Sequence, residues 1–170
     1  IYVGKNAKVT STMIHTWGEE VEVFPRTCTV VEEGGTFLSN YVCMRPTKMV
    51  QMYPTAYLKG EGAVARFSGV VVAGTGSYVD TGSRAVLQAP NTSAELITRA
   101  ITNGGTIISR GADVAECPKT KGHIECRGLI LKDGVMHAIP EIEGHVVDVE
   151  LSHEAAVGKI ARDEIEYLMA

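Results

Sequence analysis

Short runs of apolar and β-branched residues, separated by glycine-containing turns, make up most of the chain. Segments rich in Val, Ile and Thr lie at 29–31, 67–73, 95–101, 106–109 and 128–131, and this composition favours β-strands. The turn signals between them are Glu33-Gly34-Gly35, Gly60-Glu61-Gly62, Gly74-Thr75-Gly76, Asn103-Gly104-Gly105, Asp133-Gly134 and Glu143-Gly144. No segment before Ser152 keeps a 3.6-residue apolar period over three turns. The pattern therefore predicts an all-β body.

Three all-β architectures fit this pattern: a sandwich, a barrel and a β-helix. A sandwich predicts clean inside–outside alternation and hairpin turns between antiparallel strands. Here the turns recur irregularly, and residues 69–73 form an almost unbroken apolar run. Many short, similar strands fit a solenoid, in which stacking of small coils supplies the core. The pattern favours a β-solenoid, although no strict repeat motif is visible.

The end of the chain has a different pattern. From residue 161 the apolar side chains fall at i, i+4, i+7 and i+8, on one helical face: Ala161, Ile165, Leu168 and Met169. Acidic residues at 163 and 164 suit the first turn of a helix, where the helix dipole favours anions. We therefore predict a β core domain over residues 1–158 and the start of a C-terminal helical region over 159–170.

Composition limits the possible classes of protein. With 170 residues, of which 45% are hydrophobic, the chain can bury one good core. A net charge of −4 argues against a broad nucleic-acid surface. No apolar run is long enough for a transmembrane helix, so we expect no membrane partner. The chain opens without Met and ends within a helical pattern, as expected of a fragment.

Four cysteines are too few and too dispersed for a disulfide framework: Cys28, Cys43, Cys117 and Cys126. Since the apolar content is sufficient without such cross-links, we expect reduced thiols in a reducing, cytoplasmic compartment.

The densest group of potential metal ligands is Cys117, His123, Glu125 and Cys126. Thiolate, imidazole and carboxylate together suit iron or zinc, but the spacing Cys-x5-His-x2-Cys is not that of a closed zinc site. On a strand, alternation sends Glu125 and Arg127 to one face and Cys126 to the other. Cys126 therefore has two interpretations, a ligand or a small core residue, since free cysteine is often buried.

A second group, Ser152-His153-Glu154, lies near the predicted boundary. Adjacent strand residues face opposite ways, so His153 and Glu154 can point at one target only if the strand ends there. The alternative is a capped, solvated start of the helix. A hydrolytic triad is not supported, because the chain contains no GxSxG elbow. Taken alone, these residues indicate a patch of thiolate, imidazole and carboxylate, and they name no reaction.

A collinear series of blocks resembles the SufB/SufD family of iron–sulfur cluster assembly proteins, over about Thr10 to the end. The blocks are 53–62 (YPTAYLKGEG), 80–82 (DTG), 89–93 (APNTS), 103–105 (NGG), 109–111 (SRG), 124–130 (IECRGLI), 138–140 (AIP), 151–160 (LSHEAAVGKI) and 166–169 (EYLM). The resemblance implies a right-handed parallel β-helix with a helical tail. It also implies a non-enzymatic scaffold that assembles a transient iron–sulfur cluster and passes it on.

The resemblance further implies partners and site residues. Family members form SufB–SufD dimers or homodimers, dock the ABC-type ATPase SufC through the C-terminal helical region, and work with sulfur donors and acceptor apo-proteins. Cys126 matches a SufB cysteine assigned to nascent-cluster assembly at the dimer interface. Glu154 matches a SufB glutamate, and His153 a SufD histidine, with similar roles. We therefore expect Cys126 as the principal cluster or sulfur ligand, with Glu154 and His153 contributed by the facing copy of a homodimer.

Two alternatives stay open at this point. A β-helix also suits a polysaccharide lyase or hydrolase, which presents aromatic platforms and paired carboxylates, although aromatic residues are only 6% here. The chain could also be a structural subunit that binds no metal. The sequence does not fix cluster nuclearity, flavin binding, or the choice between homodimer and heterodimer, and Cys28, Cys43 and Cys117 match no family motif.

Overall fold

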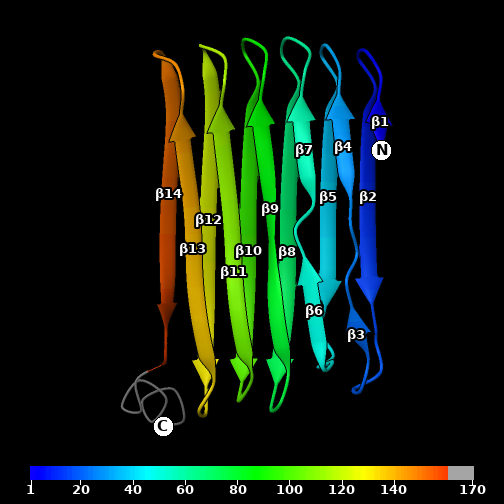
Figure 1. The fold of residues 1–170 in the computed structure, drawn as a ribbon, viewed down its shortest axis with the longest axis vertical. Coiled ribbons are helices and arrows are strands. Elements are labelled where there is room, and N and C mark those ends of the chain that lie inside the picture. Colours follow the sequence, from blue (N-terminus) through cyan, green and yellow to red (C-terminus); the bar gives the residue numbers. More distant parts are fainter. Residues whose placement is uncertain (161–170) are drawn as a thin grey trace, which may run out of the picture.

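The computed structural model describes residues 1–160, which form fourteen β-strands (Figure 1). The strands are β1 (Tyr2–Val3), β2 (Lys8–His15), β3 (Glu22–Val23), β4 (Cys28–Val31), β5 (Thr36–Cys43), β6 (Met49–Met52), β7 (Thr55–Leu58), β8 (Val64–Gly74), β9 (Tyr78–Leu87), β10 (Ser93–Asn103), β11 (Thr106–Ala115), β12 (Thr120–Leu131), β13 (Val135–Gly144) and β14 (Val149–Gly158). All five segments predicted as strands lie within this set.

The strands form two parallel sheets. One has six strands in the order β14-β12-β10-β8-β5-β2, and the other has eight and follows β1-β4-β7-β9-β11-β13, with β3 and β6 alongside. From β8 onward the chain alternates between the sheets, so each strand in one sheet is followed by a strand in the other (Figure 1). Every pairing between the named strands is parallel. The prediction of a β-solenoid is confirmed, with about six coils, and the antiparallel sandwich is excluded. Its right-handed sense stays a prediction.

The coils repeat every 28 or 29 residues at most positions. Ser93 pairs with Lys121, 28 positions later, and Thr106 pairs with Val135, 29 positions later. The same spacing separates six residues with φ between 55° and 69°: Asn6, Gly34, Gly62, Asn91, Lys119 and Asp148. Each lies in the left-handed region, which glycine and asparagine adopt most readily. These residues form a stacked edge of the solenoid, and backbone hydrogen bonds such as Gly34 N–H to Glu61 O (2.9 Å) link successive turns.

The core lies between the two sheets. Phe37 and Phe67 contact edge to face, with ring centroids 5.8 Å apart, while Leu58, Leu87 and Ile124 are almost completely buried around them. Because neither sheet could bury its inner face alone, each coil depends on its neighbours for stability.

Two local expectations need correction. Glu143 and Gly144 are the last residues of β13 and not a turn. The alternative in which Ser152, His153 and Glu154 form the start of the helix is excluded, because they lie in the middle of β14, which pairs with β12 as far as Gly158. The predicted helical segment at 161–169 falls outside the described residues. Residues 1–160 contain no helix, and therefore none long and apolar enough to cross a membrane.

Candidate functional site

Several blocks that carry the family resemblance meet side by side in the eight-stranded sheet. Thr81 of the DTG block pairs with Ser109 of the SRG block, and Ser109 pairs with Ala138 of the AIP block. Met52, directly before the block that begins at Tyr53, pairs with Thr81 on the other side. Segments that are far apart in the sequence thus form one transverse band.

Cys126 lies opposite this band, on the inner face of β12, and is 1% exposed. The Ser109 hydroxyl donates a hydrogen bond from the facing sheet to Cys126 Sγ, at 3.6 Å. Burial raises the pKa of the Cys126 thiol, and the Ser109 hydrogen bond acts in the opposite direction. The predicted alternation is confirmed, since Ile124 is also buried and Arg127 is exposed. Cys126 is therefore a buried thiol with a polar contact.

His153 comes from β14, the last described strand, where it pairs with Ile124. Ile124 is 1% exposed, so strand alternation places His153 on the same inner side as Cys126. Its Nε2 is buried and has no hydrogen-bond partner among the described residues. An imidazole nitrogen without a partner is a potential metal ligand.

Glu154 lies on the opposite face. It pairs with Glu125 on the exposed outer side of the six-stranded sheet. Among residues 1–160, no three His, Cys, Asp or Glu side chains come together closely enough to hold a metal ion. One chain therefore brings Cys126 and His153 to the same inner side and leaves Glu154 outside.

The outer face of β12 and β14 carries paired charges. Glu125 Oε1 lies 2.6 Å from Arg127 Nε and 3.0 Å from Arg99 Nη2. Burial opposes ionisation of Glu125, but the contacts with Arg99 and Arg127 and the charge of His123 hold its pKa below the ordinary value. His123 Nδ1 lies 2.8 Å from the Ser152 hydroxyl. The sequence group of Cys117, His123, Glu125 and Cys126 is therefore not assembled, because His123 and Glu125 face away from Cys126.

Asp113 is an inner-face carboxyl that sequence inspection missed. It is completely buried on β11, and neither carboxyl oxygen has a partner among the described residues. Burial raises its pKa to about 7. A side chain at Gly122, on the facing strand, would begin 2.7 Å from Asp113 Oδ2, so the glycine provides space for this carboxyl. Its position in the apolar-looking segment 107–115 gave no sign of an inward acid.

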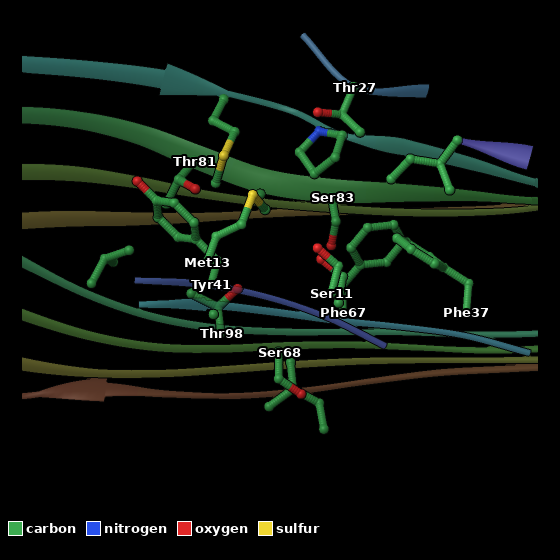
Figure 2. Close-up of a pocket in the computed structure, with 18 residues that line it drawn as sticks. Ser11, Met13, Thr27, Phe37, Tyr41, Phe67, Ser68, Thr81, Ser83 and Thr98 are labelled. Atoms are coloured by element: carbon green, nitrogen blue, oxygen red, sulfur yellow. The ribbon is translucent and has the colours of Figure 1, made fainter. Parts of the chain in front are cut away.

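A cavity of about 110 Å³ lies between the sheets, and Figure 2 shows the side chains that line it. The rings of Phe37 and Phe67 line it together with inward hydroxyl groups of Ser11, Thr81, Ser83 and Thr98. Thr98 pairs with Cys126 and Thr81 pairs with Ser109. The cavity wall thus lies one strand away from the Ser109–Cys126 contact.

All four cysteines are free thiols, and all lie within the described residues. Cys28 is exposed, Cys117 is half-buried in the turn before β12, and Cys43 is buried. The two buried thiols lie in different coils: Cys43 pairs with His15 on β2, and Cys126 lies two residues along β12 from Ile124, which pairs with His153.

Comparison with known proteins gives consistent matches. The whole chain, residues 1–170, matches the family described as "SUF system FeS cluster assembly, SufBD core domain". An "Iron-sulfur cluster assembly SufBD family protein" of Archaeoglobus fulgidus is 55% identical over 170 residues, which cover 99% of this chain and 46% of the relative. A homologous protein of Methanothermobacter thermautotrophicus (strain Winter) is 46% identical over 98% of this chain and 41% of its own length. One from Staphylococcus haemolyticus is 35% identical over the whole chain and 37% of its own length. The chain thus spans less than half the length of these relatives.

Proposed function

Because the chain belongs to the SufBD core domain family of the SUF iron–sulfur cluster assembly system, we propose that it is the core of a scaffold on which a cluster is built and from which it is transferred. The match over the full chain is the observation that carries this proposal. It favours a non-catalytic scaffold component over a carbohydrate-active β-helix or a subunit that binds no metal.

In this proposal, Cys126 is the principal ligand for the nascent cluster or its sulfur. Thiolate is the soft ligand that iron–sulfur chemistry requires, while imidazole and carboxylate bind iron more labily, which suits transfer. The Nε2 of His153, which lies on the same inner side and has no partner among the described residues, supports this assignment, while the burial of Cys126 fits the core interpretation equally well. Glu154 faces outward and joins the set from a second copy.

A homodimer through the last coils would supply that second copy. Strand β14 leaves one edge without a neighbour among the described strands, and open edges and exposed cross-sections of solenoids require covering. Apolar side chains are exposed at this end, including Ile142 (43%) and Val157 (38%). A SufB/SufD-type heterodimer would use the same surface.

The wider assembly follows the family pattern. We place the protein in the cytoplasm, with a SufC-type ABC ATPase, a sulfur donor and acceptor apo-proteins as partners. The predicted ATPase contact involves the helical region after residue 158, and the ATPase, not this chain, would hydrolyse ATP.

Anaerobic reconstitution with ferrous iron and sulfide tests the proposal, followed by absorption and Mössbauer spectroscopy. Cys126→Ser should abolish the cluster while the melting temperature changes by only a few degrees. Cys43→Ser is the control for loss of another buried thiol, and Cys28→Ser for an exposed one; both should keep the cluster. A Cys126→Ser protein that is unfolded, or that reconstitutes as well as wild type, would contradict the assignment.

A further inference from the structure

The contact between Ser109 and Cys126 joins the two sheets at the candidate site. Ser109 is 0% exposed and Cys126 is 1% exposed. Among the described residues, the Ser109 hydroxyl is the one side-chain donor to Cys126 Sγ. Cys126 belongs to the same apolar cluster as Ile124, against which Ala138 packs, and Ala155 pairs with it on β14. Thr98, which pairs with Cys126 on β10, also has an inward hydroxyl, but Ser109 is the side chain that donates to the sulfur.

The position of Ser109 is fixed from the other face of its strand. The next residue, Arg110, points outward and makes two hydrogen bonds to Asp80 on β9, at 2.6 and 3.1 Å. Gly82 pairs with Arg110, and a side chain at Gly82 would collide with the Arg110 backbone. Asp80 and Gly82 therefore hold β11 closely against β9. This contact fixes where Ser109 points on the inner face.

A thiolate in an apolar interior is unfavourable unless a hydrogen bond compensates its lost hydration. Hydrogen bonds to ionised acceptors are stronger than those between neutral groups. Groups that form hydrogen bonds to metal ligands also change the metal affinity substantially. A hydroxyl held at hydrogen-bond distance from Cys126 Sγ can compensate the lost hydration of the thiolate and affect its metal affinity.

Resting on the proposed function, we propose that Ser109 is a positioning residue for Cys126: its hydroxyl holds the sulfur in place and stabilises it as a metal-bound thiolate. Ser109 does not bind the metal. It acts through its hydrogen bond to the ligand sulfur, and the Asp80–Arg110 contact fixes it for that role.

Binding of Co²⁺ alone, followed through the thiolate-to-cobalt charge-transfer band, provides the test. Ser109→Thr keeps the hydroxyl. Ser109→Val places a side chain of nearly the same shape as threonine at this position but without the hydroxyl. We expect Ser109→Val and Ser109→Ala to weaken Co²⁺ binding by about tenfold or more. Their band should move to longer wavelength, because an unsupported thiolate gives up electron density more easily. Ser109→Thr should retain most of the wild-type affinity and band position.

The Thr and Val variants control for packing, because they have similar volumes, and their metal-free melting temperatures should be compared. Ser83→Ala removes another buried inner hydroxyl and should leave the band unchanged. If Ser109→Thr and Ser109→Val lose affinity equally, or if neither changes, the hydroxyl has no positioning role and the inference is wrong. Cys126→Ser distinguishes failure of the Ser109 inference from failure of the proposed function. If the Cys126→Ser protein keeps the charge-transfer band, Cys126 is not the ligand, and both the Ser109 inference and the proposed role of Cys126 are overturned.

Discussion

The inner and outer surfaces of the last coils both carry polar groups, but they differ in how these groups are paired. On the outer surface, Glu125 meets two arginines and Lys121 meets Glu150 at 2.9 Å. On the inner surface, Asp113 and the Nε2 of His153 have no partner among the described residues. Exposed pairs contribute little to stability, whereas buried unpaired groups reduce it. The inner groups are therefore the ones whose presence folding alone does not explain.

The largest expected effect is at Asp113. Its folded-state pKa of about 7 lies above the ordinary 3.8, so the native state keeps a proton that the unfolded chain loses. Stability attributable to this group falls as the pH rises from about 4 to 7 and is constant above. We expect the stability of Asp113→Asn, relative to wild type, to rise by about 3 kcal/mol between pH 5 and pH 8. Urea unfolding at several pH values measures this.

Asp133→Asn is the matched control, because Asp133 lies in an exposed turn after β12. It should change stability by less than about 0.5 kcal/mol at any pH. A pH-independent difference between Asp113→Asn and wild type would show that Asp113 stays ionised, and the contrast between the two surfaces would then lose its main support.

Glu125 should behave in the opposite sense. Its pKa is lowered, with the arginine contacts outweighing burial, so its stabilising contribution is present above the unfolded-state value of about 4.5 and is lost as the pH falls through the folded-state value. Glu125→Gln should be less stable than wild type at pH 7, by less than the Asp113 effect, and this difference should disappear on acidification. Thermal unfolding from pH 3 to 7 follows it, and a difference that grows toward low pH would contradict the assigned ion pairs.

The smallest effect is expected for the most exposed pair on the outer surface, Lys121 and Glu150, whose side chains are 66% and 74% exposed. A double-mutant cycle with Lys121→Ala and Glu150→Ala should give a coupling of no more than about 0.5 kcal/mol, and less at high salt. A coupling several times larger would mean that the outer surface contributes strongly to stability, against the comparison made above.

Five of the fourteen strands were predicted, because β-branched runs and glycine turns are local signals. The same pattern favoured a solenoid over a sandwich or barrel, and the family resemblance added the parallel β-helix. The sequence also predicted correctly that Cys126 and Arg127 face opposite ways. The 28–29-residue period was missed because its marker positions carry four residue types, from Gly34 to Lys119 and Asp148. A search restricted to glycine finds only two of the six.

The site was harder to predict, since its contacts cross the solenoid. Ser109 is 17 positions from Cys126, and only the coil geometry shows that the two face each other. The alternative of a helix start at His153 was wrong because the pairing of β14 with β12, which no local pattern reports, continues to Gly158. For the same reason the outward direction of Glu154 became clear only in the structure.

The near-constant spacing between coils has a consequence for folding kinetics. Every coil reaches its predecessor by closing a loop of almost the same length, as the pairings of Ser93 with Val64 and Lys121 illustrate. The entropy of loop closure is then nearly equal along the chain, so it gives no coil priority as a nucleus. Local packing decides instead, and the coils joined by Phe37 and Phe67 are the natural starting point. Growth would proceed outward one coil at a time, so the coils that carry Cys126 and His153 would form late and would be the first to open.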